Sequence, residues 1–289
     1  LLELLDNMVN TMYDRQELSV HIGNYETTYN SELKYLFSNG LLILTQNGQM
    51  QFFHQTMFDY VYARRFAEHD RNLMEELKEQ HQGLFSRAAI KSILTFQRDI
   101  NTPAYKENIE KMLFDKGEDG KDIYRYHLKS LVLSNMVYFE FPKKEELDLI
   151  CRKIYDNEQY MGILFESIHN KNWFDKIWII IESKGGWNSL KISYKEKVMT
   201  MCRRTLHSNT NKILDLANQI LDYGNSDDRS LVERLLSFYK LNCSSEKLIS
   251  IYEKMVVSRH PLEYTSILRN IVKESPEYVC NELKENIKI

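Results

Sequence analysis

Residues 41–66 read LLILTQNGQMQFFHQTMFDYVYARRF and contain the most specific fold signal of the chain. Two apolar runs, Leu41 to Leu44 and Met50 to Phe53, flank a short polar segment with an Asn-Gly pair at its centre. An Asn-Gly pair readily adopts the positive φ angles that a tight two-residue turn requires. The stretch therefore predicts a β-hairpin, and the aromatic run after His54 predicts a helix.

The segment before the hairpin extends this prediction to a small domain. Ser31 to Phe37 has the apolar spacing of a short helix, and Asn39-Gly40 supplies residue types that commonly end helices. The order helix, strand, helix, hairpin is typical of a winged-helix unit, a relative of the helix-turn-helix. We therefore predict a winged-helix domain over residues 1–70.

The remainder of the chain, residues 71–289, has an almost wholly helical pattern. Residues 248–256, for example, repeat apolar side chains at the i, i+3, i+4, i+7 and i+8 positions of one helix face. The four prolines each stand where a helix would begin: Pro103, Pro142, Pro261 and Pro276. The fold class is thus mainly α, with an irregular α-solenoid of HEAT- or TPR-like helix pairs as the prediction and a compact helical domain as the alternative.

Composition and charge narrow the classes of partner. The chain has 289 residues and a formal net charge of -3, so it has no strong field that would attract nucleic acid or an anionic membrane. No apolar run approaches the roughly 20 residues that a membrane-spanning helix needs. The four cysteines are scattered without a CxxC pair, which is typical of reduced cysteines in a cytoplasm. We expect a cytoplasmic protein without a membrane partner.

The stretch from Leu36 to Phe66 resembles the end of the winged-helix domain in STAND-class NTPases, particularly the NACHT and NLR-like group of bacteria. Their pattern places F-x-H-x-[ST]-[FY]-x-[DE]-[YF] directly after a hairpin. The positions that match it are Phe52, His54, Thr56, Asp59 and Tyr60, followed by Ala63 in the helix. Met57 stands where that family usually has an aromatic residue. The resemblance covers about the first quarter of the chain.

The resemblance implies a role for His54 in a nucleotide switch. In that family the histidine donates an N–H to the β-phosphate of ADP, which keeps the resting protein closed. The nucleotide, ADP or ATP with magnesium, would be held by a nucleotide-binding domain upstream of Leu1, and this chain alone would bind no cofactor. The helical region would sense a ligand or protein, and activation would assemble a homo-oligomer. The uncapped apolar opening LLELLDNMVNTMYD agrees with an excised piece of a larger protein.

Motifs for catalysis or metal binding are not found in the sequence. The nearest approach to a phosphate-binding loop, Gly117 to Asp122, has too short a glycine spacing and is predicted to be a loop between helices. No HExxH, GxSxG or Cys/His cluster with ligand spacing occurs. We therefore expect no enzyme activity and no metal site in this chain, although the parent protein would be an ATPase.

Four alternatives remain open. His54 can be a structural capping residue, with Phe52, Phe58, Tyr60 and Phe66 as core. Trp173, Trp178 and Trp187 can line a partner-binding surface or can fill a helical core. The whole chain can also be an all-α scaffold whose winged helix is purely structural. A DNA-binding regulator is least favoured, because the helix at 31–39 offers a single basic side chain.

Overall fold

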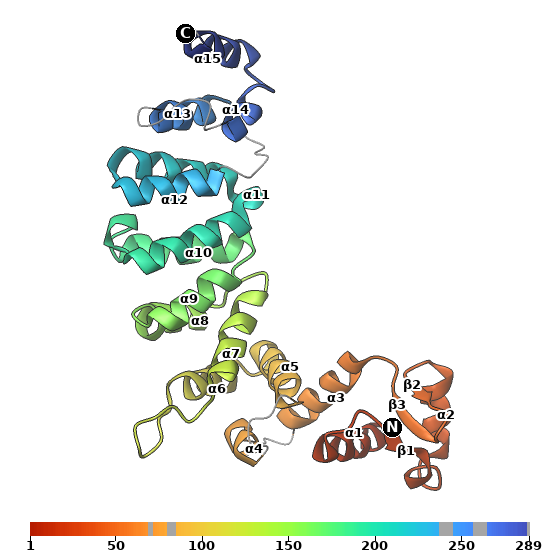
Figure 1. Cartoon of the computed structure of the whole chain (residues 1–289). Coiled ribbons are helices and arrows are strands. Elements are labelled where there is room, and N and C mark those ends of the chain that lie inside the picture. Colours follow the sequence, from red (N-terminus) through yellow and green to blue (C-terminus); the bar gives the residue numbers. More distant parts are fainter. Residues whose placement is uncertain (69–71, 80–84, 237–244, 257–264, 288–289) are drawn as a thin grey trace. The chain divides into compact units, whose positions relative to one another are not determined.

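The computed structural model describes residues 1–68, 72–79, 85–236, 245–256 and 265–287. It is mainly helical with one small antiparallel sheet (Figure 1). The chain divides into two compact units, Leu1–Asn135 and Met136–Ile289. The predicted domain boundary near residue 70 falls inside the first unit, because the helices on either side of it pack together. The extent of a separate winged-helix domain stays a prediction of the sequence.

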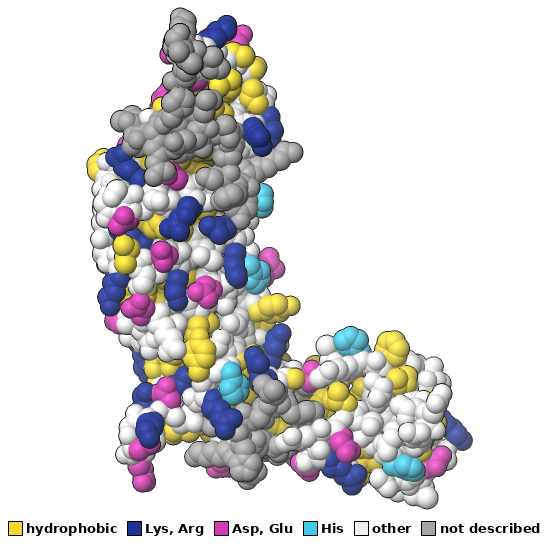
Figure 2. All heavy atoms as spheres, viewed as in Figure 1, with side chains coloured by type: hydrophobic (Ala, Val, Ile, Leu, Met, Phe, Trp, Pro, Cys, Tyr) yellow, Lys and Arg dark blue, Asp and Glu magenta, His cyan; other side chains and the backbone are white. Residues whose placement is uncertain are grey.

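The surface of the second unit carries both signs of charge. Figure 2 shows basic and acidic side chains intermixed over its visible face. Among the described residues, no helix combines the length and the apolar character that a membrane crossing would need.

The sheet lies near the start of the first unit. The elements there are α1 (Leu2–Arg15), β1 (Val20–His21), the 3-10 helix η1 (Ile22–Asn24), α2 (Asn30–Ser38), β2 (Leu42–Leu44), β3 (Gln49–Phe52) and α3 (Gln55–Glu68). The strand order is β1-β3-β2, and Leu44 of β2 pairs with Met50 of β3. Gly48 in the connecting turn has a φ of 68°, a conformation that glycine adopts without steric cost. The predicted hairpin is confirmed.

Aromatic side chains spaced four residues apart pack α3 into the core of the first unit. Phe58, Tyr62 and Phe66 share one helix face and are buried. Tyr62 stacks on Tyr13 of α1 with ring centroids 4.1 Å apart. Tyr60 does not join this core, because its position in the helical turn places it on the opposite face. It is 57% exposed and its ring meets Phe96 edge-on at 6.2 Å.

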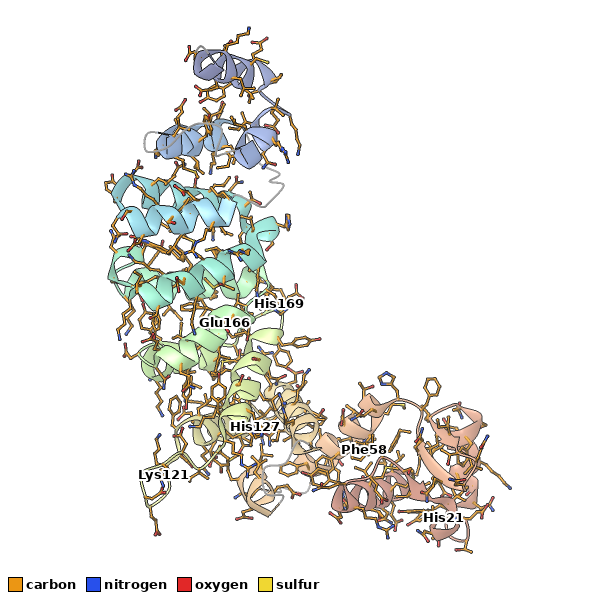
Figure 3. All side chains as sticks on the ribbon, viewed as in Figure 1. His21, Phe58, Lys121, His127, Glu166 and His169 are labelled. Carbon is orange, nitrogen blue, oxygen red and sulfur yellow. The ribbon has the colours of Figure 1, made fainter. Side chains whose placement is uncertain are left out.

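Four further helices begin in the first unit: α4 (Leu73–Glu79), α5 (Phe85–Ile100), α6 (Thr102–Phe114) and α7 (Tyr126–Tyr138). Pro103 lies in the first turn of α6, and the side chain of Asn101 caps that turn by accepting the Ala104 N–H at 3.2 Å. The segment from Gly117 to Asp122 is the predicted loop between helices, and Figure 3 shows Lys121 at its tip.

The second unit begins within the last turn of α7, and α8 is the first helix that lies wholly inside it. Its elements are α8 (Lys144–Leu149), the π-turn η2 (Ile150–Ile154), α9 (Glu158–Ser167), α10 (Lys171–Ser183), the 3-10 turn η3 (Trp187–Ser189), α11 (Ile192–Tyr223), α12 (Ser226–Leu236), α13 (Ser245–Val256), α14 (Thr265–Ile271) and α15 (Pro276–Ile287). Asn209 interrupts α11 with non-helical backbone angles (φ −131°, ψ 23°). We therefore treat residues 192–208 and 210–223 as two helices joined at a kink.

These helices are arranged in two rows, and neighbours within each row contact one another. In one row, the first half of α11 lies between α9 and α12, and Tyr194 meets Phe165 with ring centroids 5.9 Å apart. In the other row, the second half of α11 lies between α10 and α13, and ion pairs at 2.6 Å join Lys212 to Asp175 and Lys247 to Asp215. These pairs link residues 37 and 32 positions apart, which is about the length of one helix pair.

Candidate functional site

His54 lies between β3 and α3 and caps the start of α3 with its ring. The backbone N–H of Thr56 donates to His54 Nδ1 at 3.2 Å, and Thr56 Oγ1 lies 2.8 Å from the same nitrogen. A side chain that accepts a hydrogen bond from the first turn satisfies one of the free N–H groups of a helix terminus. The structure thus gives His54 a capping contact.

The same contact determines the hydrogen-bonding role of the other ring nitrogen, Nε2. Because Nδ1 accepts a backbone N–H, the proton of the neutral imidazole lies on Nε2. The His54 side chain is exposed, and among the described residues Nε2 has no hydrogen-bond partner. Capping and donation to an external group are therefore compatible, because they use opposite sides of one ring.

His21 provides an internal comparison for His54. Its Nδ1 accepts the Gly23 N–H at 3.2 Å, so this ring also caps a short helical segment, η1. Its Nε2 lies against the hairpin turn, only 3.2 Å from where a side chain at Gly48 would begin. The two exposed histidines share one local geometry, but the Nε2 of His21 faces the protein's own turn.

Asp59 lies in α3 with its carboxyl group partly shielded from solvent. It is half-buried, and within the described part of the chain Oδ1 has no hydrogen-bond partner. Burial raises the pKa of this carboxyl group, and the positive charge of Lys91 opposes the shift. Asp59 is thus a residue whose charge is disfavoured in the folded state.

The three tryptophans occupy different surroundings. Trp173 is completely buried and donates its indole N–H to the Phe139 carbonyl at 2.8 Å. Trp187 is also buried, and Lys195 Nζ lies 5.3 Å from its ring centroid. Only Trp178 is partly exposed. Of the three tryptophans, only Trp178 can therefore contribute to a partner-binding surface.

Trp178 borders a groove between α10 and the second half of α11. Its ring stacks on Phe174 with centroids 6.3 Å apart and planes 7° apart, and its indole N–H donates to Glu182 at 2.8 Å. The groove has a volume of about 230 Å³, and Ile179 beside it is 56% exposed. Asp175 and Asp215 at its edge are already paired with Lys212 and Lys247. This leaves the Trp178 ring and Glu182 to attract a basic side chain beside the apolar floor.

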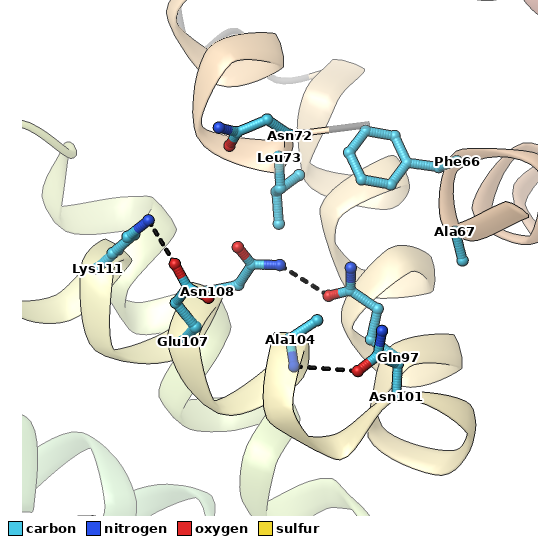
Figure 4. Close-up of a pocket in the computed structure, with 10 residues that line it drawn as sticks. All are labelled: Phe66, Ala67, Asn72, Leu73, Gln97, Asn101, Ala104, Glu107, Asn108 and Lys111. Atoms are coloured by element: carbon cyan, nitrogen blue, oxygen red, sulfur yellow. Dashed lines mark hydrogen bonds and ion pairs between the residues drawn. The ribbon is translucent and has the colours of Figure 1, made fainter. Parts of the chain in front are cut away.

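A second hollow, of about 270 Å³, lies in the first unit among the ends of α3, α4, α5 and α6 (Figure 4). Gln97 and Asn108 form an amide pair on its wall, with Asn108 Nδ2 donating to Gln97 Oε1 at 2.8 Å. The sequence interpretation missed this site. Its signal was a polar Gln97 at the i+7 position of the apolar stripe formed by Ile90, Ile93 and Leu94, a position that normally carries an apolar side chain.

The described residues do not bring together three or more His, Cys, Asp or Glu side chains in an arrangement that could hold a metal ion. Cys151, Cys202 and Cys280 are free thiols, and Cys243 lies outside the described residues. Burial raises the pKa of the Cys202 thiol to about 12, so this sulfur is a core group without nucleophilic character at neutral pH.

Comparison with protein-family models, with curated proteins and with solved structures found no match to this chain.

Proposed function

We propose that the start of the chain is the winged-helix part of a STAND-class nucleotide switch, in which His54 donates its Nε2–H to a nucleotide phosphate. The single observation that supports this role is the capping contact of His54. Holding Nδ1 at the start of α3 fixes the tautomer and leaves the Nε2–H exposed, as a phosphate-binding imidazole requires.

The surrounding elements are compatible with this proposal. The order α1, β1, η1, α2, β2, β3 and the antiparallel sheet β1-β3-β2 are those expected of a winged helix. In the proposed arrangement a preceding domain would bind ADP or ATP with magnesium, and this chain would contribute one hydrogen bond rather than catalysis. The proposed setting is the cytoplasm of a bacterium, with a homo-oligomer as the active form.

The test compares two histidines in the protein with its natural upstream sequence, which should encode a phosphate-binding loop. His54→Ala should shorten the retention time of ADP on the purified protein, because one charge-assisted hydrogen bond is lost. His21→Ala is the matched control, because it removes an exposed capping ring whose Nε2 faces the protein's own turn. Equal ADP release from His54→Ala and from the parent would refute the latch.

A second candidate function is protein binding through the helical region, and the groove at Trp178 favours it. The two rows of helices support a solenoid of HEAT- or TPR-like pairs, a fold class that presents extended binding surfaces. We propose that the groove accepts a peptide segment with a basic side chain beside the Trp178 ring and an apolar side chain near Ile179.

Peptides selected from a displayed library test this second role. Peptides that bind the chain should be enriched in Lys or Arg, and Trp178→Ala should weaken them. Tyr223→Ala provides the control, because Tyr223 is an exposed aromatic residue of α11 outside the groove. Selected peptides that bind Trp178→Ala as well as they bind the parent would place the binding surface elsewhere.

A further inference from the structure

The hollow in the first unit has one apolar side and one side built of amides. Phe66 from the end of α3 and Leu73 from the start of α4 form the apolar side, and both are almost fully buried. Gln97 of α5 and Asn108 of α6 face them across the hollow (Figure 4). The charged rim residues Glu107 and Lys111 pair with each other at 2.6 Å, so the lining is close to neutral.

The amide pair uses only part of its hydrogen-bonding capacity. Each primary amide has two N–H donors and one carbonyl acceptor, and one bond joins Asn108 Nδ2 to Gln97 Oε1. Figure 4 shows Asn108 Oδ1 and Gln97 Nε2 on the same side of this bond, directed toward Leu73 and Phe66. Neither atom has a partner among the described residues. Rotating both amides by half a turn exchanges the two atoms and preserves one acceptor and one donor.

Gln97 is unusual because it is only 6% exposed. The Gln97 Nε2–H is not shut off from solvent but opens to the hollow, where a ligand carbonyl can take the place of water. A purely structural link between α5 and α6 would need just one bond. Ile90, Ile93 and Leu94 on the same stripe of α5 show that apolar side chains fit this face. A polar side chain at an otherwise apolar stripe position, with its free N–H directed into a hollow, is a donor placed where a ligand can reach it.

We infer that this hollow binds a small, uncharged, planar ligand that presents an N–H beside a carbonyl group, the edge found in carboxamides and in nucleobase lactams such as uracil. The ligand N–H donates to Asn108 Oδ1, and the ligand carbonyl accepts from Gln97 Nε2. Phe66 and Leu73 are only 1% and 2% exposed, so they limit the size of the ring and the two amide hydrogen bonds carry the binding. The volume of about 270 Å³ lies just below the range of sites for drug-sized ligands, about 300–1,000 Å³, so one ring is the expected size. This binding does not depend on the nucleotide switch.

Titration of the whole isotope-labelled chain followed by NMR tests the inference. Uracil and nicotinamide at millimolar concentration should shift the side-chain amide signals of Gln97 and Asn108. The matched ligand control is 1,3-dimethyluracil, which keeps the ring and carbonyls but has no N–H. Gln97→Met should weaken binding about two- to tenfold, as expected for the loss of one hydrogen bond. Gln219→Met, the same change at an exposed site of α11, should leave the affinity unchanged.

Each outcome decides the question. Binding of uracil alone assigns a nucleobase edge, binding of nicotinamide alone assigns a carboxamide edge, and binding of both supports the shared edge. The inference is overturned when neither compound shifts the two amide signals, or when 1,3-dimethyluracil binds as well as uracil. If circular dichroism shows that Gln97→Met does not fold, Asn108→Ala at the half-buried partner replaces it, and an unchanged affinity then overturns the inference.

Discussion

At the scale of single residues, the ring of His54 combines a structural role with an available donor. The cap on α3 has its own measurable consequence, separate from any nucleotide. His54→Ala should lower the free energy of unfolding by about 1 kcal/mol, and His54→Asn by less, because asparagine is itself a favoured N-cap residue. Urea denaturation of the two variants measures this difference. Equal losses in both variants would show that the capping contact does not stabilise α3.

Asp59 allows a prediction of a stability effect whose size depends on pH. Burial raises the pKa of its carboxyl group in the folded state above the unfolded value, so the folded state binds the proton more tightly. The destabilisation that comes from burying the ionised carboxylate is therefore absent below the unfolded pKa. It grows as pH rises and is complete above the folded pKa. Asp59→Asn should raise the urea midpoint at pH 7 and leave it unchanged near pH 3. A lower midpoint at pH 7 would mean that the attraction to Lys91 outweighs burial.

At the scale of elements, the ion pair between Lys195 and Asp228 joins the first half of α11 to α12. Both side chains are buried, at 8% and 3% exposed, and Lys195 Nζ lies 2.9 Å from each carboxylate oxygen. Removing one partner leaves an uncompensated buried charge. Asp228→Ala should therefore cost about 3–5 kcal/mol of unfolding free energy, whereas Lys195→Met with Asp228→Leu should be close to neutral.

The exposed pair between Lys254 and Asp222 is the control for this measurement. It has the same residue types at 2.8 Å, but both side chains contact solvent. Asp222→Ala should cost no more than about 1 kcal/mol. If urea denaturation shows that Asp228→Ala and Asp222→Ala lower the free energy of unfolding by similar amounts, burial does not explain the stabilisation by the Lys195–Asp228 pair.

These elements also show what the sequence could and could not predict. The hairpin at Gly48 and the helix start at Pro103 depend on backbone preferences of neighbouring residues, and both were predicted correctly. The burial of Lys195 depends on Asp228, 33 residues away, and the pairing of Gln97 with Asn108 depends on how α5 meets α6. Local periodicity contains no signal for such partners. The sequence therefore predicted elements better than polar sites.

At the scale of the whole molecule, the second unit consists of helices supported mainly by their nearest neighbours. The first half of α11 packs between α9 and α12, whereas α15, at the end of the described chain, meets α14 and forms hydrogen bonds with α13, from Tyr278 to Glu253 and from Tyr252 to Glu282. When each helix pair contacts only adjacent pairs, local unfolding can occur from an end without global unfolding. Stability should therefore decrease from α11 towards α15.

Native-state hydrogen exchange measures this gradient. The amides of α11 should exchange with the highest opening free energies, and those of α15 with the lowest. Met255→Ala removes a buried side chain of α13 and should cost about 2–5 kcal/mol locally. If contacts are limited to neighbours, the substitution should speed exchange in α13, α14 and α15 while leaving α9 and α10 almost unchanged. A uniform increase throughout the second unit would instead identify a single cooperative domain, the compact helical alternative to a solenoid.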